Sequence, residues 1–389
     1  MKKAILIVLD SLGIGPMPDC ARYGDDNPHT LQSLYQSQPK ITYPNLEKMG
    51  LKRLIDPNDQ TKYIKGAYFG KLAEKSVGKD TTTGHWEMCG IITTEALAVY
   101  PNGFPKEMLK PFLAYLGSGI LGNEAASGTE IIERFGAEHL QSAKPIIYTS
   151  ADSVLQIAAH EDVIPLERLY EMCAKARELY KNPPYQVGRI IARPFYGEIG
   201  KFVRDNANRR DYALDPPQPH LLTCLAEQGK EVVAVGKIED IFAKSGITKA
   251  IHTVSNNDGM AKTITAYQNL TNGLIFTNLV EFDSKYGHRR DPLGYAQALA
   301  GFDEQLPQLT EILDDETLLI ICADHGCDPL APGSDHTREY VPWLIYSPAF
   351  NEGGMIPKGE SFADIGATIA QYLEIAYPLP GKSCLSILR

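Results

Sequence analysis

Short apolar runs alternate with segments of helical periodicity along this chain, and this alternation restricts the fold more than any other feature. Apolar runs rich in Ile, Val and Leu are typical of strands buried on both faces of a parallel sheet. The pattern therefore predicts an α/β fold with a doubly wound, mainly parallel sheet. We expect strands at Ala4–Leu9, Val232–Val235, Leu274–Phe282, Thr317–Ala323 and Val341–Tyr346, and helices at Leu221–Gln228, Gly259–Leu270, Pro292–Leu313 and Phe362–Ile375.

The middle of the chain is bracketed by prolines and predicts a separate domain. A chain of 389 residues exceeds what one core usually holds. We expect an inserted, smaller α+β cap domain at residues 99–213 between two parts of the core, 1–98 and 214–389, with a helix at Leu166–Tyr180 and a strand at Val187–Ala192. The alternative is one domain with a long loop, but a structureless insertion of this length is unusual. The bracketing prolines are Pro101, Pro105, Pro111, Pro216, Pro217 and Pro219.

Charge and cysteine content exclude several classes of protein. A net charge of -10 argues against nucleic acid or an anionic membrane as a partner. An anionic substrate then needs local positive charge, which bound metal ions supply. The seven cysteines are odd in number and contain no C-x-x-C pair, which favours reduced thiols and a cytoplasmic location. The apolar run after Lys3 ends at Asp10, too early for a signal peptide or a membrane span.

Three of the expected strands are followed directly by an aspartate. Asp10 follows Leu9, Asp283 follows Phe282, and Asp324 follows Ala323. Each one alone would be read as a turn former or a helix cap. Because ligands of open α/β sheets bind outside the carboxyl ends of the strands, the three together predict one site at this edge.

Histidines accompany two of these aspartates. His288 lies five residues after Asp283, His325 follows Asp324, and His336 lies eleven residues beyond His325. A single histidine is more often a hydrogen-bonded polar residue than a ligand. Mixed carboxylate and imidazole ligands suit Mn²⁺, Zn²⁺ or Fe²⁺ better than Ca²⁺, and the set contains no thiolate. The pattern predicts a transition-metal site.

The run Gly78–Glu87 contains three consecutive threonines before an expected helix. One interpretation is a turn in which Asp80 or Thr83 caps the helix. The other is a nucleophilic hydroxyl at a helix N-terminus, where free N–H groups favour anions. The sequence pattern alone leaves both open.

Four segments resemble the metal and nucleophile motifs of the alkaline phosphatase superfamily: Val8–Gly15, Gly78–His85, Asp324–Gly326 and Asp335–Glu339. Within that superfamily the chain is most similar to the bacterial phosphopentomutase family, with which it shares Thr149–His160, Val187–Phe195 and Phe282–Pro292. The resemblance runs nearly from end to end. It implies a core of alkaline phosphatase type with an inserted cap.

The resemblance also implies an activity and a set of site residues. The expected reaction exchanges phosphate between C1 and C5 of ribose or 2-deoxyribose, with pentose phosphates as small-molecule partners. Either a sugar bisphosphate activates the enzyme, or the enzyme is already phosphorylated; the sequence leaves both open, and it leaves the oligomeric state open as well. Thr81 would be the phosphorylated nucleophile. Two Mn²⁺ ions, or other divalent metals, would be held by Asp10, Asp324 and His325 and by Asp283, His288 and His336, and the substrate would be contacted by Asp152, Arg189, Arg204 and Lys237.

Four other functions are alternatives to this one. Phosphoglycerate mutases with this metal core use a serine nucleophile, and sulfatases need a modification motif that is not found around Thr81. A phosphatase would share the core but admit water. A non-catalytic protein that binds metal or sugar phosphate would leave the threonine run without a purpose.

Overall fold

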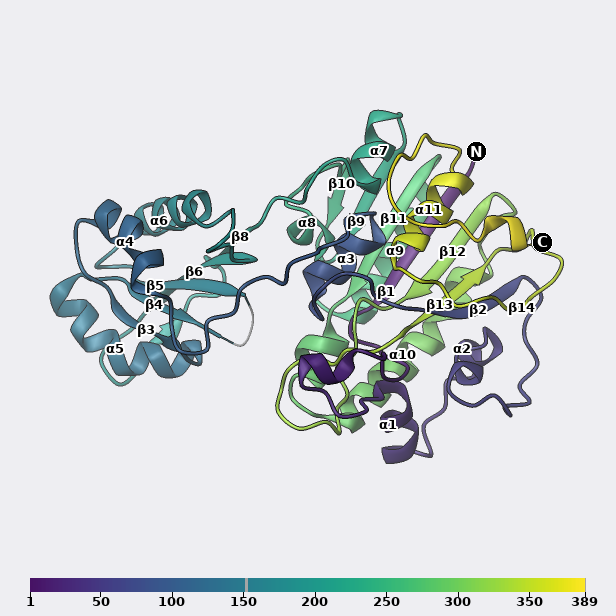
Figure 1. Cartoon of the computed structure of the whole chain (residues 1–389), viewed down its shortest axis with the longest axis horizontal. Coiled ribbons are helices and arrows are strands. Elements are labelled where there is room, and N and C mark those ends of the chain that lie inside the picture. The colour runs from purple at the N-terminus through teal and green to yellow at the C-terminus, as the bar shows by residue number, and fades with distance from the viewer. Residues whose placement is uncertain (151–152, 389) are drawn as a thin grey trace. The chain divides into compact units, whose positions relative to one another are not determined.

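The chain forms two compact units in a computed structural model that describes residues 1–150 and 153–388. The first unit joins Met1–Glu95 to Pro216–Arg389, and the second is Ala96–Asp215. The segment expected as an insertion, 99–213, lies within the second unit. Figure 1 shows the elements of each unit.

The first unit is built on an eight-stranded sheet in the order β10-β9-β11-β1-β12-β13-β2-β14. β1 lies between β11 and β12 and runs parallel to both. Every residue of β11 is buried, as is typical of strands covered on both faces. The strands are β1 (Lys3–Leu9), β2 (Ala67–Leu72), β9 (Glu231–Val235), β10 (Lys249–Ile251), β11 (Gly273–Leu279), β12 (Thr317–Cys322), β13 (Val341–Tyr346) and β14 (Gly354–Met355).

The sheet is mainly parallel, with one strand reversed. β13 pairs antiparallel with β12 on one side and with β2 on the other. The expected strand Val341–Tyr346 thus forms with its predicted bounds but runs against its neighbours. The fold class expected from the sequence, a doubly wound α/β sheet, is confirmed.

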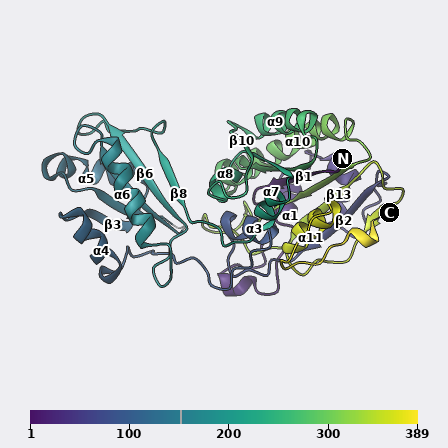
Figure 2. The same ribbon diagram turned by 90° about the horizontal axis from the view of Figure 1, so that it is seen from above.

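Helices cover both faces of this sheet. Figure 2 shows α9 (Asn256–Asn269) and α10 (Pro292–Thr310) on one face and α7 (Leu221–Glu227) and α11 (Ala363–Tyr372) on the other. Asp291 caps α10 as expected, because its side chain accepts a hydrogen bond from the Gly294 N–H. The remaining helices of the unit are α1 (Thr30–Ser37), α2 (Pro44–Lys48), α3 (Thr81–Met88), α8 (Ile238–Ile241) and the short turns η1 (Cys20–Tyr23), η2 (Lys52–Leu54), η3 (Phe282–Gly287) and η4 (Leu385–Ile387).

The strand expected at Leu274–Phe282 is shorter than predicted. β11 ends at Leu279, and Phe282–Gly287 forms η3, a π-helical turn. The backbone N–H of Glu281 donates to the side-chain oxygen of Asn256 at the start of α9, 3.0 Å away, instead of to a neighbouring strand. Asp283 therefore projects from η3 and does not follow the strand directly.

The second unit has its own sheet and its own core. Its sheet has the order β3-β4-β5-β6-β7, with β8 beside β6. Helices α4 and α6 pack against one face with Phe112 and Leu169, and α5 packs against the other with Ile131 and Ile132. The elements are β3 (Leu121–Ala125), β4 (Ile146–Thr149), β5 (Val154–His160), β6 (Arg189–Tyr196), β7 (Val203–Arg204), β8 (Arg210–Ala213), α4 (Lys106–Leu116), α5 (Gly128–Ser142) and α6 (Leu166–Leu179).

Among the described residues, no helix combines the length and the apolar character that crossing a membrane requires.

Candidate metal centre

The three aspartates expected at strand ends meet at one edge of the first unit's sheet. Asp10 follows β1 directly, Asp324 lies two residues after β12, and both are fully buried. His325 Nε2 lies 3.5 Å from Asp10 Oδ1 and 3.4 Å from Asp324 Oδ2. One donor atom from each of these residues falls within 4.8 Å of the others, which is close enough to share one cation.

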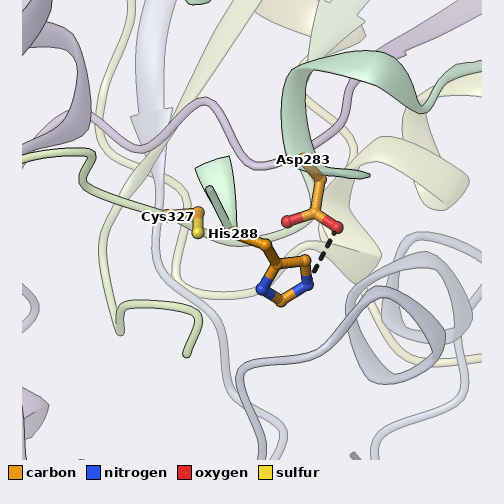
Figure 3. Close-up of side chains that lie close together, drawn as sticks. All are labelled: Asp283, His288 and Cys327. Carbon is orange, nitrogen blue, oxygen red and sulfur yellow. Dashed lines mark ion pairs between the residues drawn. The ribbon is translucent and has the colours of Figure 1, made fainter. Parts of the chain in front are cut away.

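A second group of donors surrounds Asp283. Figure 3 shows the ion pair between His288 and Asp283. His288 Nε2 lies 3.2 Å from Asp283 Oδ2, and His336 Nε2 lies 3.3 Å from Asp283 Oδ1. The two imidazole Nε2 atoms are 3.1 Å apart. His325 joins the two groups, because it also lies with Asp283 and His336 in a set of convergent donors.

Three oxygens in these groups fit a cation and little else. Asp10 Oδ1, Asp283 Oδ1 and Asp324 Oδ2 are buried, and no residue in the described part of the chain donates a hydrogen bond to them. Buried polar atoms are nearly always paired, and an unpaired buried carboxylate oxygen is costly. Divalent metal ions would give all three oxygens a partner, so the donor set fits the metals that the sequence pattern predicts.

The outer nitrogens of two histidines are already engaged. His325 Nδ1 lies 3.0 Å from the Gly326 carbonyl, and His288 Nδ1 lies 2.6 Å from the Ser334 carbonyl. A carbonyl only accepts hydrogen bonds, so each Nδ1 carries the proton. The Nε2 atoms then face the aspartates, and with a metal ion bound their lone pairs would be directed at it, as metal-binding histidines require.

Burial and mutual repulsion govern the charges of the aspartates. Burial raises the pKa of Asp10 far above its usual value, and the charges of Asp324 and Asp283 raise it further. Burial also acts to raise the pKa of Asp324, but His325 and His85 lower it to about 2. For Asp283, burial is outweighed by His336 and His288, which hold its pKa well below the usual range. The three carboxylates are ionised together only when cations compensate them.

Thr81 is placed beside this centre. It is the first residue of α3, and its hydroxyl oxygen lies 3.3 Å from His325 Nε2. Asp80 is the cap of α3, since its carboxylate accepts from the Thr83 N–H at 3.1 Å and from the Thr83 hydroxyl at 2.6 Å. The capping role is thus held by Asp80, and the hydroxyl of Thr81 remains directed at the donor set.

Two buried residues that the sequence analysis did not assign support the centre. His85 Nδ1 lies 2.8 Å from the Thr81 carbonyl, to which it donates, and 3.2 Å from Asp324 Oδ2. The Asn278 amide donates to Asp10 Oδ2 at 2.8 Å and faces His85 Nε2 at 3.2 Å. A fully buried amide inside the apolar strand β11 is the sequence signal that could have revealed Asn278.

Two positively charged side chains hold the loops around the centre in place, and neither was predicted from the sequence to belong to the site. The buried guanidinium of Arg338 donates to the Glu74 carboxylate and to the Gly78 carbonyl, which lies 2.6 Å away. Lys79 Nζ lies 3.0 Å from Asp25 Oδ1 and 3.0 Å from Asp335 Oδ2. These contacts join the segment before Thr81 to the segment that carries His336.

A cysteine also borders the second group. Figure 3 shows Cys327 beside His288 and Asp283, and these three residues form another convergent set of donors. The sequence pattern had indicated a centre without thiols. The sulfur of Cys327 accepts a hydrogen bond from Arg290 at 3.2 Å, and burial raises the pKa of its thiol. A protonated thiol is a poor metal ligand, so the carboxylates and imidazoles remain the preferred donors.

The four residues expected at the substrate are distributed over both units. Lys237 lies in the first unit between β9 and α8, where its charge opposes the upward shift of the Asp10 pKa that burial and Asp324 cause. Arg189, in β6, and Arg204, in β7, belong to the second unit, and Arg189 Nη1 lies 3.7 Å from Asp211. Asp152 lies outside the described residues.

The sequence as a whole is similar to a described family and to named relatives. The profile of the metalloenzyme superfamily matches residues 2–377. A phosphopentomutase of Caldanaerobacter subterraneus subsp. tengcongensis is 52% identical over 390 aligned positions, covering 99% of this chain and 98% of the relative. A phosphopentomutase of Desulfitobacterium hafniense is 49% identical, with 100% of both chains covered.

Solved structures share the fold at much lower sequence identity. The PH0037 protein of Pyrococcus horikoshii matches with a TM-score of 0.50 and 14% identity over 98% of this chain and 99% of that protein. A phosphoglycerate mutase of Leishmania mexicana matches with a TM-score of 0.50 and 12% identity over 98% and 97% of the two chains. At such identities these matches bear on the fold alone.

Proposed function

Because the chain belongs to the metalloenzyme superfamily and, within it, to the phosphopentomutase family, we propose that it exchanges a phosphoryl group between C1 and C5 of ribose or 2-deoxyribose through a phosphorylated Thr81. Family membership makes the chain an isomerase that uses divalent metal. The observation that carries the proposal is the Thr81 hydroxyl, which lies 3.3 Å from Nε2 of His325, the residue shared by two sets of convergent donors.

We propose two Mn²⁺ ions, one held by Asp10, Asp324 and His325 and the other by Asp283, His288 and His336. Carboxylate and imidazole donors suit Mn²⁺, although other divalent metals share this preference. Bound there, a pair of divalent cations supplies charge that stabilises the attacking and leaving oxygens of a phosphoryl transfer. The convergent donors of Asp10, Asp324 and His325 support the first site, and the short distances from Asp283 to His288 and His336 support the second.

The protein's own groups prepare Thr81 for attack. Asp80 fixes the start of α3 through Thr83, so that the Thr81 side chain is held in one place. Free N–H groups of a helix N-terminus favour anions, and the first turn of α3 is therefore suited to phosphoryl oxygens. His85 donates a hydrogen bond to the Thr81 carbonyl and lies next to Asp324. These two contacts fix the position of the nucleophile relative to the Asp324 carboxylate.

The transfer has two halves in this proposal. The free hydroxyl of the bound sugar monophosphate attacks the phosphorus atom on Thr81, and the bond between phosphorus and the Thr81 oxygen breaks. The sugar becomes a bisphosphate, and the proton lost by its hydroxyl restores the hydroxyl of Thr81. The phosphoryl group at the other sugar carbon then passes to Thr81, and the isomeric monophosphate leaves. Lys237, Arg189, Arg204 and Asp152 are proposed to bind the sugar phosphate, and a sugar bisphosphate is the proposed activator.

All seven cysteines are free thiols, which supports the proposal of a cytoplasmic enzyme.

The test is the location of phosphate on the protein. Incubation with ribose 1,5-bisphosphate followed by peptide mass spectrometry should find phosphate on Thr81. Thr81→Ala should lose mutase activity and retain its metals, whereas Thr81→Ser should retain part of the activity because the oxygen survives. Thr82→Ala, at the next residue of α3, is the matched control and should retain activity. Phosphate on Thr82 or Thr83, or full activity of Thr81→Ala, would overturn the assignment.

A further inference from the structure

One buried carboxylate next to the loops of the metal centre belongs to neither set of proposed ligands. Glu339 is 1% exposed, and its two oxygens accept four hydrogen bonds. Oε1 accepts from the hydroxyls of Thr30 and Thr337, both at 2.7 Å. Oε2 accepts from the N–H groups of Gly15 and Thr30, at 3.0 and 2.9 Å. Because all four partners donate, the ionised carboxylate is the form that satisfies them.

Thr30 and Thr337 extend the effect of this carboxylate to the turn after β12. Each hydroxyl gives its only proton to Glu339, so its lone pairs are left to accept hydrogen bonds. The Thr30 hydroxyl accepts from the Cys327 N–H and the Thr337 hydroxyl from the Asp328 N–H, both at 3.1 Å. The carboxylate thus sets the direction of both hydroxyls and, through them, the course of this turn.

The same turn is joined to the segment that carries a ligand of the second proposed metal site. Gly326 and Thr337 exchange two backbone hydrogen bonds, at 3.0 and 2.8 Å. The Gly326 carbonyl also accepts from His325 Nδ1 at 3.0 Å, which restrains that imidazole. Gly326 follows His325, and Thr337 follows His336. One ligand of each proposed metal site therefore stands next to this bridge.

Two glycines leave room for the carboxylate. A Cβ built at Gly13 or at Gly326 would collide with the Glu339 carboxylate, so the backbone passes close to it at both positions. Gly13 lies in the loop after Asp10, and Gly326 lies in the turn after His325. The carboxylate is therefore located where the loops that follow two proposed ligands meet.

We propose that Glu339 is a positioning residue of the metal centre, whose carboxylate holds His325 and His336 in place through two threonine hydroxyls. The inference rests on the ligands named in the proposed function. Groups that orient metal ligands typically contribute about 10–100-fold to metal affinity. Glu339→Gln keeps the size of the side chain but turns one acceptor into a donor that faces donors. Mn²⁺ should therefore bind this variant about 10–100-fold more weakly.

The experiment titrates the metal-free full chain with Mn²⁺ and counts the free ion by electron paramagnetic resonance. Burial raises the pKa of Glu339 to about 7, although its hydrogen bonds act to lower it, so a titration at about pH 8 keeps the carboxylate ionised.

Asp303→Asn is the matched control. Asp303 is also 1% exposed, and its carboxylate accepts from the N–H groups of Asn45 and Leu46, between α10 and α2. This variant should lower the free energy of unfolding, as Glu339→Gln does, but leave the Mn²⁺ affinity unchanged.

A second pair of variants tests the path through a hydroxyl and does not require Glu339→Gln to fold. Thr337→Val removes the hydroxyl while nearly keeping the shape of the side chain, so the Mn²⁺ affinity should fall. Thr337→Ser keeps the hydroxyl and should recover most of the affinity that Thr337→Val loses.

Three results would overturn the inference: a folded Glu339→Gln that binds Mn²⁺ within about twofold of the unmodified chain, an equal loss of affinity in Asp303→Asn, or equal affinities of the two Thr337 variants. The proposed function is tested separately. Full mutase activity of Thr81→Ala would contradict the nucleophile and leave this inference standing. Unchanged Mn²⁺ binding in Asp10→Ala and Asp283→Ala would contradict the ligands and this inference with them.

Discussion

At the scale of single residues, the centre depends on three buried aspartates, each with one oxygen that has no hydrogen-bond donor among the described residues. Asp324→Ala and Asp283→Ala should each abolish activity, because each removes a donor from one of the two proposed metal sites. Metal analysis by mass spectrometry should find one ion lost per variant, while circular dichroism should show a largely intact fold. Asp315→Ala, at an exposed position, is the control and should change neither quantity. Near-full activity in either centre variant would contradict the ligand assignment.

His85 should matter through the residues that it positions. It donates to the Thr81 carbonyl and adjoins Asp324, and Asn278 links it to Asp10. Loss of such an outer partner typically weakens metal affinity about 10–100-fold. We expect His85→Gln to show this loss in a metal titration followed by calorimetry. His252→Gln, with an exposed side chain, should leave the affinity unchanged. If the metal affinity of His85→Gln were unaltered, His85 would not position the metal ligands and would only pack in the core.

The sequence located the residues of the centre that stand next to strand ends or in recognisable motifs. Asp10 and Asp324 follow strands as predicted. The roles of His85 and Asn278 were not predicted, because these roles depend on a contact between residues that are 193 positions apart. The amide inside the apolar strand β11 marks Asn278, but no local pattern of polarity indicates which distant residue it contacts.

At the scale of elements, the buried, positively charged side chain of Arg338 joins two loops near the metal centre. Arg338 is almost fully buried, and its guanidinium pairs with Glu74 and donates to the Gly78 carbonyl. Burial acts to lower the pKa of Arg338, but Glu74 raises it above the usual value. Removing one partner of a buried ion pair costs about 3–5 kcal/mol. Arg338→Met should therefore lower the free energy of unfolding by an amount of this order in urea denaturation.

The double variant Arg338→Met/Glu74→Leu separates the charge from the packing. Because it removes both charges, it should recover a large part of the stability that the single variant loses. If the single variant loses less than about 1 kcal/mol, which is the usual worth of an exposed ion pair, Arg338 does not fix this loop.

Element type and position followed from periodicity, but direction did not. Val341–Tyr346 was expected as a strand and forms with those bounds, yet it runs antiparallel to β12. An apolar run looks the same in either direction. The end of β11 was misplaced for a related reason: Val280 and Phe282 continue the apolar pattern, although hydrogen bonding to Asn256 turns the backbone at Glu281.

At the scale of the whole molecule, the second unit, Ala96–Asp215, has its own sheet with packed helices on both faces. We propose that it acts as a cap, because a phosphoryl group on Thr81 reaches a sugar hydroxyl only where water is kept away. Replacing residues 96–215 by a short Gly-Ser linker should therefore speed the hydrolysis of phosphorylated Thr81.

That prediction is checked by following the release of inorganic phosphate from the phosphorylated protein. The full chain is the reference, and circular dichroism verifies that the shortened protein is folded. Equal rates of phosphate release from the two proteins would show that water exclusion is not the role of this unit.

The position of β1 bears on how the enzyme is made in the cell. Its partners in the sheet are β11 and β12, which leave the ribosome some 260 to 320 residues later. At a synthesis rate of about 5–20 residues per second, residues 3–9 wait roughly 15 to 60 seconds for their second neighbour. During that interval an apolar segment is exposed on the nascent chain, while the second unit, complete much earlier, is free to fold. The yield of folded enzyme should therefore depend on chaperones that bind the nascent chain more than on chaperones that act after release from the ribosome.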